Sequence, residues 1–219
     1  MNLQNCVMAL EMREGNSNVV VDKTKYHNNG TIFGARRQFQ EGMYFDGIND
    51  YIDCGDKDDL EASSNFTAEA WFQVNDHTER TVVSKRQSSG GYVGWQVRLL
   101  SSTSILYYTT YSTTSISKIV TVPDLGTSWH HIAYTITNDV GQLYLDGVVV
   151  GIASTGVGSV TTTSAVFSVG SANGGIQFFD GMIDGVRIYN ISLSANEVKK
   201  RYYDSKLERW KALQNLFRM

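Results

Sequence analysis

One stretch near the end of the sequence, residues 181–190, constrains the fold of this chain more than any other. Its residues alternate with a period of two, which is the pattern of a β-strand. The alternation places three residues on each side: Ile183, Gly185 and Arg187 on one, and Asp184, Val186 and Ile188 on the other. Charged side chains are rarely buried unless they are paired or bound to a metal ion. We therefore predict a closing strand whose lone acid, Asp184, needs a partner from elsewhere in the chain.

The residues after this strand predict a helix over 194–219. Ser194 is followed three residues later by Glu197, which is a typical helix start because the two side chains can cap backbone N–H groups. Apolar residues then recur at a roughly helical spacing: Val198, Tyr202, Leu207, Trp210, Leu213 and Phe217. This segment has seven basic and three acidic residues, so its net charge is +4. The whole chain has a net charge of −3, which leaves −7 on the remainder.

Almost every segment before residue 190 has the pattern of a strand or a turn. In residues 66–74, for example, Ala68 and Phe72 fall on one face, and Glu69 and Trp71 fall on the other. The 219 residues contain a single proline, and turn residues separate short apolar segments throughout. We predict an all-β chain, an antiparallel jelly-roll β-sandwich of two sheets with a C-terminal α-helix. Residues 1–193 form the sandwich, and residues 194–219 form an amphipathic helix.

The composition excludes several classes of protein. A net charge of −3 lacks the basic footprint of a nucleic-acid-binding protein. We see no signal peptide, and no run of apolar residues is long enough for a transmembrane segment. The two cysteines, Cys6 and Cys54, are too few for a disulfide framework. They are either free buried thiols or a single bridge.

Six separated stretches of the sequence resemble one family, the laminin-G-like, concanavalin A-like jelly rolls. They occur in the family's order, and they cover about residues 6–203. The stretches are 21–31, 44–52, Phe66-Thr67-Ala68-Glu69-Ala70-Trp71, Trp129-His130-His131-Ile132-Ala133, Gln142-Leu143-Tyr144-Leu145-Asp146-Gly147 and 183–189. The resemblance implies the sandwich fold, but it does not identify a ligand, because this fold is found in lectins, adhesion domains and glycosidases.

The resemblance also implies a structural Ca²⁺ ion that joins the N-terminal region to the last strand. It places the ion at Asp22, the backbone of Asn29 and Gly30, Asp46 and Asp184. Calcium takes six to eight oxygen ligands from carboxylates, carbonyls and water, so these residue types are suitable. The alternative is that Asp22 and Asp46 are ordinary turn residues that accept hydrogen bonds from the local backbone.

The sequence gives no sign of a catalytic site. A retaining glycosidase needs two carboxylates about 5 Å apart, and the strand of Glu69 carries no second acid. His130 and His131 are adjacent on a strand, so they point to opposite faces and cannot share a metal ion. We predict that the protein is not an enzyme.

Aromatic residues in the strands are the remaining indication of a ligand. Four of them are candidates for stacking on sugar rings: Trp95, Tyr107, Tyr108 and Tyr111. Aromatic residues are also common in cross-strand packing, which is the alternative role for all four.

The helix has three alternative roles. It packs on its own domain, it docks to a partner or a second copy through Leu207, Trp210, Leu213 and Phe217, or it lies on a membrane surface. We expect a non-catalytic carbohydrate-binding or adhesion module that contacts a glycan or a protein surface. The alternative is a structural surface protein, such as a virion decoration protein, which assembles through this helix. Both functions place the protein outside the cell or on a virion surface.

Overall fold

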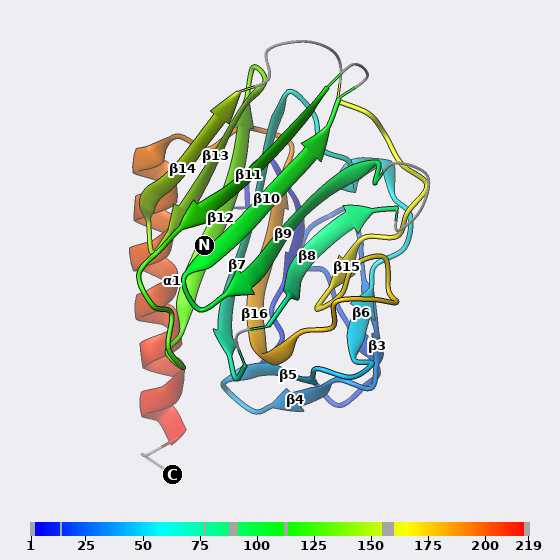
Figure 1. The fold of residues 1–219 in the computed structure, drawn as a ribbon. Coiled ribbons are helices and arrows are strands. Elements are labelled where there is room, and N and C mark those ends of the chain that lie inside the picture. The colour runs from blue at the N-terminus through cyan, green and yellow to red at the C-terminus, as the bar shows by residue number, and fades with distance from the viewer. Residues whose placement is uncertain are drawn as a thin grey trace.

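The computed structural model describes residues 3–13, 15–76, 78–87, 92–111, 114–154 and 160–216. Two antiparallel sheets of eight strands lie face to face, and one helix runs along the outside of the first sheet (Figure 1). This arrangement confirms the predicted two-sheet sandwich with a C-terminal helix.

The first sheet, sheet A, is built around β16 (Asp180–Tyr189), the strand that carries Asp184. One edge of β16 pairs with β7 (Asn65–Val74). The other edge pairs with β5 (Gly42–Asp46) over its first half and with β1 (Cys6–Leu10) over its second. The sheet continues beyond β7 and β5 through β12 (His130–Thr137), β13 (Val140–Leu145), β14 (Val148–Ser154) and β4 (Arg36–Gln38).

The second sheet, sheet B, runs in the order β11, β10, β9, β8, β15, β6, β3 and β2. Its strands are β11 (Ser115–Thr121), β10 (Ser104–Thr110), β9 (Gly94–Ser101), β8 (Arg80–Arg86), β15 (Ser168–Val169), β6 (Tyr51–Asp53), β3 (Gly30–Phe33) and β2 (Val19–Val20). A short 3₁₀ helix, η1 (Asp58–Leu60), follows β6. The hydrophobic core lies between the two sheets and includes Phe45, Phe72 and Trp95, none of which is exposed.

A β-bulge in β16 changes the alternation that the sequence predicts. The register with β7 shifts between Asp184 and Arg187, and Gly185 has a φ of +59°, which favours glycine. Ile183, Val186 and Ile188 all lie in the core between the sheets. Asp184 and Arg187 therefore both point to the outer face of sheet A, so the predicted sharing of one side by Asp184, Val186 and Ile188 is wrong.

The C-terminal helix, α1 (Ala195–Leu216), begins at the predicted capping box. Ser194 donates its backbone N–H to the Glu197 carboxylate at 2.8 Å, and the Glu197 N–H donates to Ser194 Oγ at 3.4 Å. One side of α1 packs on the outer face of sheet A, where Val198 joins a second apolar cluster with Tyr144 and Tyr189. Within the described residues, no helix has the length and apolar character needed to cross a membrane.

Candidate functional site

The outer face of sheet B combines polar and aromatic side chains in the middle of the sheet. Along β9, Trp95 and Val97 point into the core, so the intervening Gln96 and Arg98 point outward. On β10, Tyr108 lies directly opposite Gln96 in the register and shares its face. Arg86 on β8 lies close to these residues. Arg98 and Tyr108 therefore both act electrostatically on its guanidinium.

Tyr92, just before β9, completes this group of residues. The Arg86 guanidinium lies over the Tyr92 ring, 4.7 Å from its centroid, and 54% of the Tyr92 side chain is exposed. Burial lowers the pKa of Arg86 from its usual value, and burial also raises the pKa of Tyr108. We call the five residues Arg86, Tyr92, Gln96, Arg98 and Tyr108 the β8–β10 site.

In the part of the chain that the structure describes, three buried polar atoms of this site have no hydrogen-bond partner. They are Arg86 Nε, Gln96 Oε1 and Arg98 Nε. The Gln96 residue is 1% exposed, and Arg98 donates a hydrogen bond from its Nη1 atom to Glu79 at 3.4 Å. Buried polar groups are nearly always paired in folded proteins, since an unpaired one costs about 1–3 kcal/mol. Unpaired atoms beside an exposed tyrosine are the features expected of a site that binds a polar ligand.

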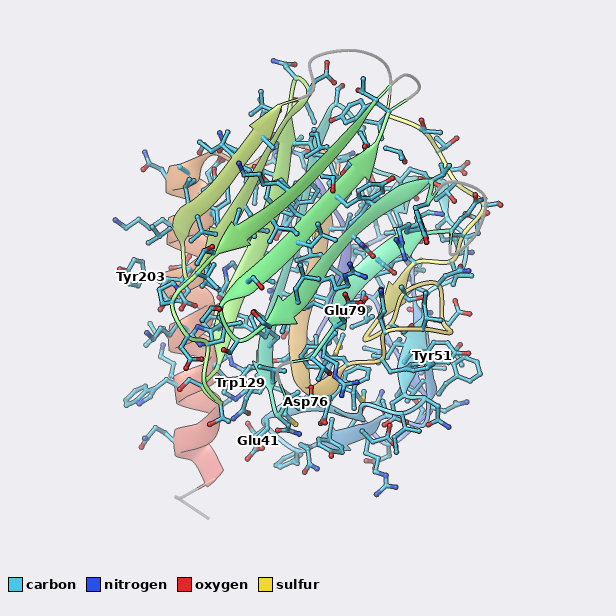
Figure 2. The ribbon with its side chains drawn as sticks, in the orientation of Figure 1. Glu41, Tyr51, Asp76, Glu79, Trp129 and Tyr203 are labelled. Carbon is cyan, nitrogen blue, oxygen red and sulfur yellow. The ribbon has the colours of Figure 1, made fainter. Side chains whose placement is uncertain are left out.

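A second group of aromatic rings lies further along the same face. Phe33 on β3 and Tyr51 on β6 are opposite each other in the register, and their rings stack with centroids 4.7 Å apart. The Phe178 ring lies 6.5 Å from Tyr51, whose side chain reaches the edge of the molecule in Figure 2. Sequence analysis missed this stack, because only the register between β3 and β6 brings the rings together.

Of the four aromatic residues predicted to contact sugars, only Tyr108 lies on an outer face. Trp95 and Tyr107 have no exposed surface, and Tyr111 is 4% exposed. The Trp95 ring packs in the core 4.8 Å from the Phe66 ring, and its indole N–H donates to the Leu60 carbonyl. The prediction is therefore wrong for these three residues, since strand alternation turns them inward while it turns Tyr108 outward.

The residues predicted to hold calcium do not form one site. The Asp22 carboxylate accepts hydrogen bonds from the backbone N–H groups of Ala9, Thr24 and Asn28, and from the Thr24 hydroxyl. Its own backbone N–H donates to Asn29 Oδ1 at 2.9 Å. The alternative of a local structural role for Asp22 agrees with these contacts.

Asp46 accepts hydrogen bonds from its own turn, and Gly30 packs closely against β6. Asp46 Oδ1 accepts hydrogen bonds from the backbone N–H groups of Ile48 and Asn49, as a turn-forming aspartate does. Gly30 lies so close to β6 that an added Cβ would stand 2.4 Å from Ile52 Cγ2.

Asp184 is neutralised by two arginines. Its carboxylate contacts Arg13 Nε at 2.8 Å and Arg209 Nη1, and it accepts a hydrogen bond from the Met12 N–H at 3.1 Å. Burial raises the pKa of Asp184, while the two guanidinium groups oppose that shift. No group of three or more His, Cys, Asp or Glu side chains in the described ranges could hold a metal ion. These residues do not fit a calcium ion as they stand, because their carboxylate oxygens face N–H groups and guanidinium cations.

A second buried carboxylate, Glu69, lies under α1 on the same face of sheet A. It accepts hydrogen bonds from Arg201 of the helix at 2.8–3.0 Å and lies 3.6 Å from His131 Nε2. Burial alone would raise the pKa of Glu69, but hydrogen bonds from His131 and Arg201 hold it well below its usual range. The helix thus covers a layer of buried, paired charges on this face.

The helix residues predicted to dock a partner lie partly within the described residues. Leu207 and Trp210 are 50% and 58% exposed, and Tyr203, one turn before Leu207, is 57% exposed. Tyr203 projects from α1 away from the sandwich (Figure 2). The Leu213 side chain and Phe217 lie outside the described part of the structure.

Comparisons with known proteins are consistent with a binding module. A family model described as the concanavalin A-like lectin/glucanases superfamily matches residues 16–199. The adhesion G-protein coupled receptor V1 of Danio rerio is 28% identical over 142 residues, which are 62% of this chain and 2% of the receptor.

Solved structures with the same fold include two toxin binding domains. The botulinum neurotoxin serotype G binding domain has a TM-score of 0.71 and 16% identity, over 92% of this chain and 51% of that one. The binding domain of Paraclostridial Mosquitocidal Protein 1 has a TM-score of 0.67 and 16% identity, over 91% and 52%. The chain thus spans about half of each of these domains, and the likeness concerns the fold alone.

Proposed function

The chain belongs to the concanavalin A-like lectin/glucanase superfamily, and on that premise we propose that it is a non-catalytic carbohydrate-binding module. Its ligand lies on the outer face of sheet B, against the β8–β10 site. The observation that carries this proposal is the set of three buried polar atoms without partners, next to the exposed Tyr92 ring.

A saccharide matches the chemistry of these atoms. The three atoms are buried in the free protein, so we expect their side chains to turn outward on binding. A sugar hydroxyl both donates and accepts hydrogen bonds, so neighbouring hydroxyls can then accept from Arg86 Nε and Arg98 Nε and donate to Gln96 Oε1. The apolar face of a sugar ring can pack against the Tyr92 ring, which offers a flat surface with a polar end. A purely apolar ligand would leave the three atoms unpaired.

The absence of catalysis is supported by the state of the two carboxylates under α1. A glycosidase needs an acid and a base or nucleophile in contact with its substrate. Glu69 is 2% exposed and Asp184 is not exposed, and each carboxylate forms an ion pair with an arginine of α1. Similarity to an adhesion receptor supports an extracellular role in adhesion.

A glycan array with the full chain tests the proposal. The Tyr92→Ala and Gln96→Leu variants should each weaken binding about tenfold, the equivalent of roughly 1.4 kcal/mol. Phe39→Ala is the matched control, because Phe39 is 62% exposed but lies after β4, away from sheet B. An array without any bound glycan, or equal binding by all variants, would show that this face does not bind sugars.

A second candidate function is assembly through α1, as expected of a surface or decoration protein. The exposed stripe formed by Tyr203, Leu207 and Trp210 supports it, since adjacent large apolar side chains often mark an interaction surface. Light scattering of the full chain and of a Leu207→Glu variant tests this function. Assembly predicts that the wild-type protein forms an oligomer, which the variant loses, whereas two monomers would leave only a different partner for the stripe.

A further inference from the structure

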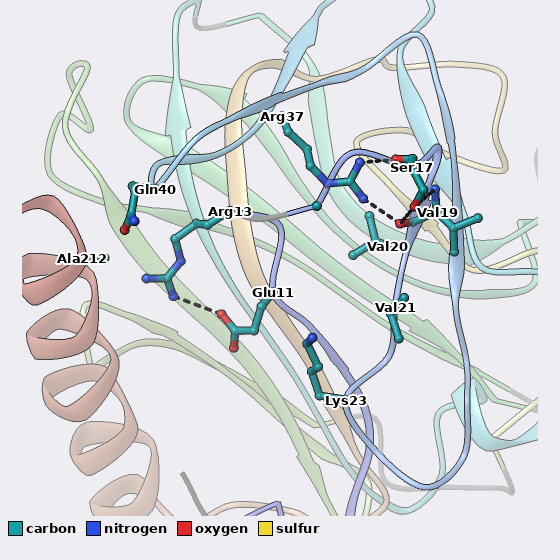
Figure 3. A pocket seen from close by; sticks show the side chains of 11 residues that line it. Glu11, Arg13, Ser17, Val19, Val20, Val21, Lys23, Arg37, Gln40 and Ala212 are labelled. Carbon is teal, nitrogen blue, oxygen red and sulfur yellow. Dashed lines mark hydrogen bonds and ion pairs between the residues drawn. The ribbon is translucent and has the colours of Figure 1, made fainter. Parts of the chain in front are cut away.

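A cavity of about 470 Å³ lies on another side of the molecule, away from the β8–β10 site. Residues within the segment 11–23, which follows β1 and includes β2, form most of its wall. Arg37 of β4, Gln40 and Ala212 of α1 complete it (Figure 3). None of the contacts described for the β8–β10 site involves a residue of this cavity.

Arg37 presents an unused donor to the cavity. Its two terminal nitrogens donate to the carbonyls of Ser17 and Val19, the latter at 2.6 Å, and these bonds fix the guanidinium (Figure 3). Its Nε atom is buried and has no hydrogen-bond partner among the described residues. A guanidinium is always charged, so this N–H is suited to an anionic oxygen.

Gly15 keeps the space beside that donor open. Its φ of +104° is a conformation that other residues rarely adopt. A Cβ added to Gly15 would stand 3.6 Å from Arg37 Nε. Any larger residue would therefore occupy the position from which a ligand atom can reach the Nε–H.

The charges around the cavity favour an anion. Of the side chains that the structure describes, three basic ones line it, Arg13, Lys23 and Arg37, together with one acidic side chain, Glu11. Glu11 is already paired with Arg13 at 3.0 Å and with Arg187. Among the described residues, no side chain forms an ion pair with Lys23, whose ammonium group borders the cavity in Figure 3.

The remaining wall includes an apolar part, formed by Val19, Val20 and Val21, beside the polar Ser17 and Gln40. Inorganic anions have no group that would benefit from this wall, whereas an organic anion with an apolar body would bury surface against it. We propose that this cavity binds a small organic carboxylate with an apolar body. The carboxylate lies between Arg37 Nε and the Lys23 ammonium, and the body lies against the valines.

Ligand titration by saturation-transfer NMR tests the proposal with three probes and the full chain. Benzoate should bind saturably, and benzamide, its neutral analogue, should bind at least about tenfold more weakly, because it lacks the charge that Arg37 and Lys23 attract. Inorganic phosphate has no carbon-bound protons to observe, so it is added as a competitor of benzoate; because it has charge but no apolar body, it should bind more weakly and displace benzoate poorly. Equal binding of benzamide and benzoate, or of phosphate and benzoate, overturns the proposal.

Two variants with matched controls locate the site. Lys23→Gln and Arg37→Lys should each weaken benzoate binding about tenfold. Lys25→Gln and Arg36→Lys alter exposed residues of the same types nearby and should leave it unchanged. Equal weakening by Lys25→Gln would indicate an effect of net charge only, and equal weakening by Arg36→Lys would indicate an effect that is not specific to the cavity. Either result would overturn the site. If Arg37→Lys loosens the segment around Ser17, Lys23→Gln still decides, since it removes no backbone hydrogen bond.

Discussion

At the scale of single residues, arginine–carboxylate pairs join α1 to the sandwich. Arg201 reaches Glu69 on β7, and Arg209 reaches Asp184 on β16. The Arg209 guanidinium also lies 3.7 Å from the centroid of the Trp129 ring, near the last turns of α1 (Figure 2). Removing one partner of a buried pair costs roughly 3–5 kcal/mol, because the other charge is left without compensation.

Glu69→Gln should therefore lower the free energy of unfolding by about 3–5 kcal/mol at neutral pH. The pKa of Glu69 is lower in the folded state, so its contribution is complete above the unfolded value of about 4.3. That contribution is lost as the pH falls below this value, and the wild-type Tm should fall more steeply in acid than the variant's.

Glu79→Gln is the control for this measurement, because 59% of the Glu79 side chain is exposed. Thermal melts of all three proteins at a series of pH values provide the comparison. A Glu69→Gln variant as stable as wild type at neutral pH would mean that the pair contributes nothing to folding.

Cys6 and Cys54 are both free and buried, which decides between the two alternatives left by the sequence. Burial raises the pKa of Cys6 to about 11 and also raises that of Cys54. Since the thiolate is the reactive form, neither thiol should react with Ellman's reagent in the native protein, and both should react in denaturant. Rapid reaction of either native thiol, or fewer than two thiols in denaturant, would contradict this assignment.

At the scale of elements, α1 is part of the domain rather than an appendage. The Trp71 indole donates to Ser205 Oγ at 2.9 Å, and its ring stacks on Tyr202 with centroids 5.6 Å apart. These contacts lie on β7, near the centre of sheet A, so losing the helix would expose buried charged and aromatic groups.

Truncation after Tyr203 should lower the Tm strongly, because it removes Ser205 and Arg209 and leaves Trp71 and Asp184 without these partners. A chain that ends at Leu216 keeps every described contact of α1 and should melt like the full chain. Thermal melts by circular dichroism distinguish the two outcomes. Equal Tm values for both truncations would mean that α1 does not stabilise the sandwich.

Some of these elements could be predicted from the sequence and others could not. Local patterns were sufficient for the alternation of β7 and for the capping box at Ser194, because both depend on near neighbours. The bulge at Gly185 and the partners of Asp184 depend on contacts between distant segments. Arg13, for example, precedes Asp184 by 171 residues. Alternation separates Tyr107 from Tyr108, but which of the two faces the core depends on how sheet B packs against sheet A, and the sequence of this strand alone does not show that.

At the scale of the whole molecule, two arginine side chains connect the last strand to segments that precede and follow it in the sequence. Arg13 follows β1, Arg209 belongs to α1, and both meet at Asp184. We therefore expect chelation by EDTA to leave the Tm of the purified protein unchanged. A fall of several degrees, reversed by added calcium, would restore the predicted ion at a site with other ligands.

The pairing of β1 with β16 has a consequence for how the protein folds during synthesis. Cys6 lies opposite Tyr189, so this part of sheet A cannot form until nearly the entire sandwich has left the ribosome. Until then β1, whose five side chains are all buried in the final structure, has no surface to cover it. The nascent chain therefore exposes an apolar segment for most of its synthesis, and β1 is where we expect a chaperone to bind first.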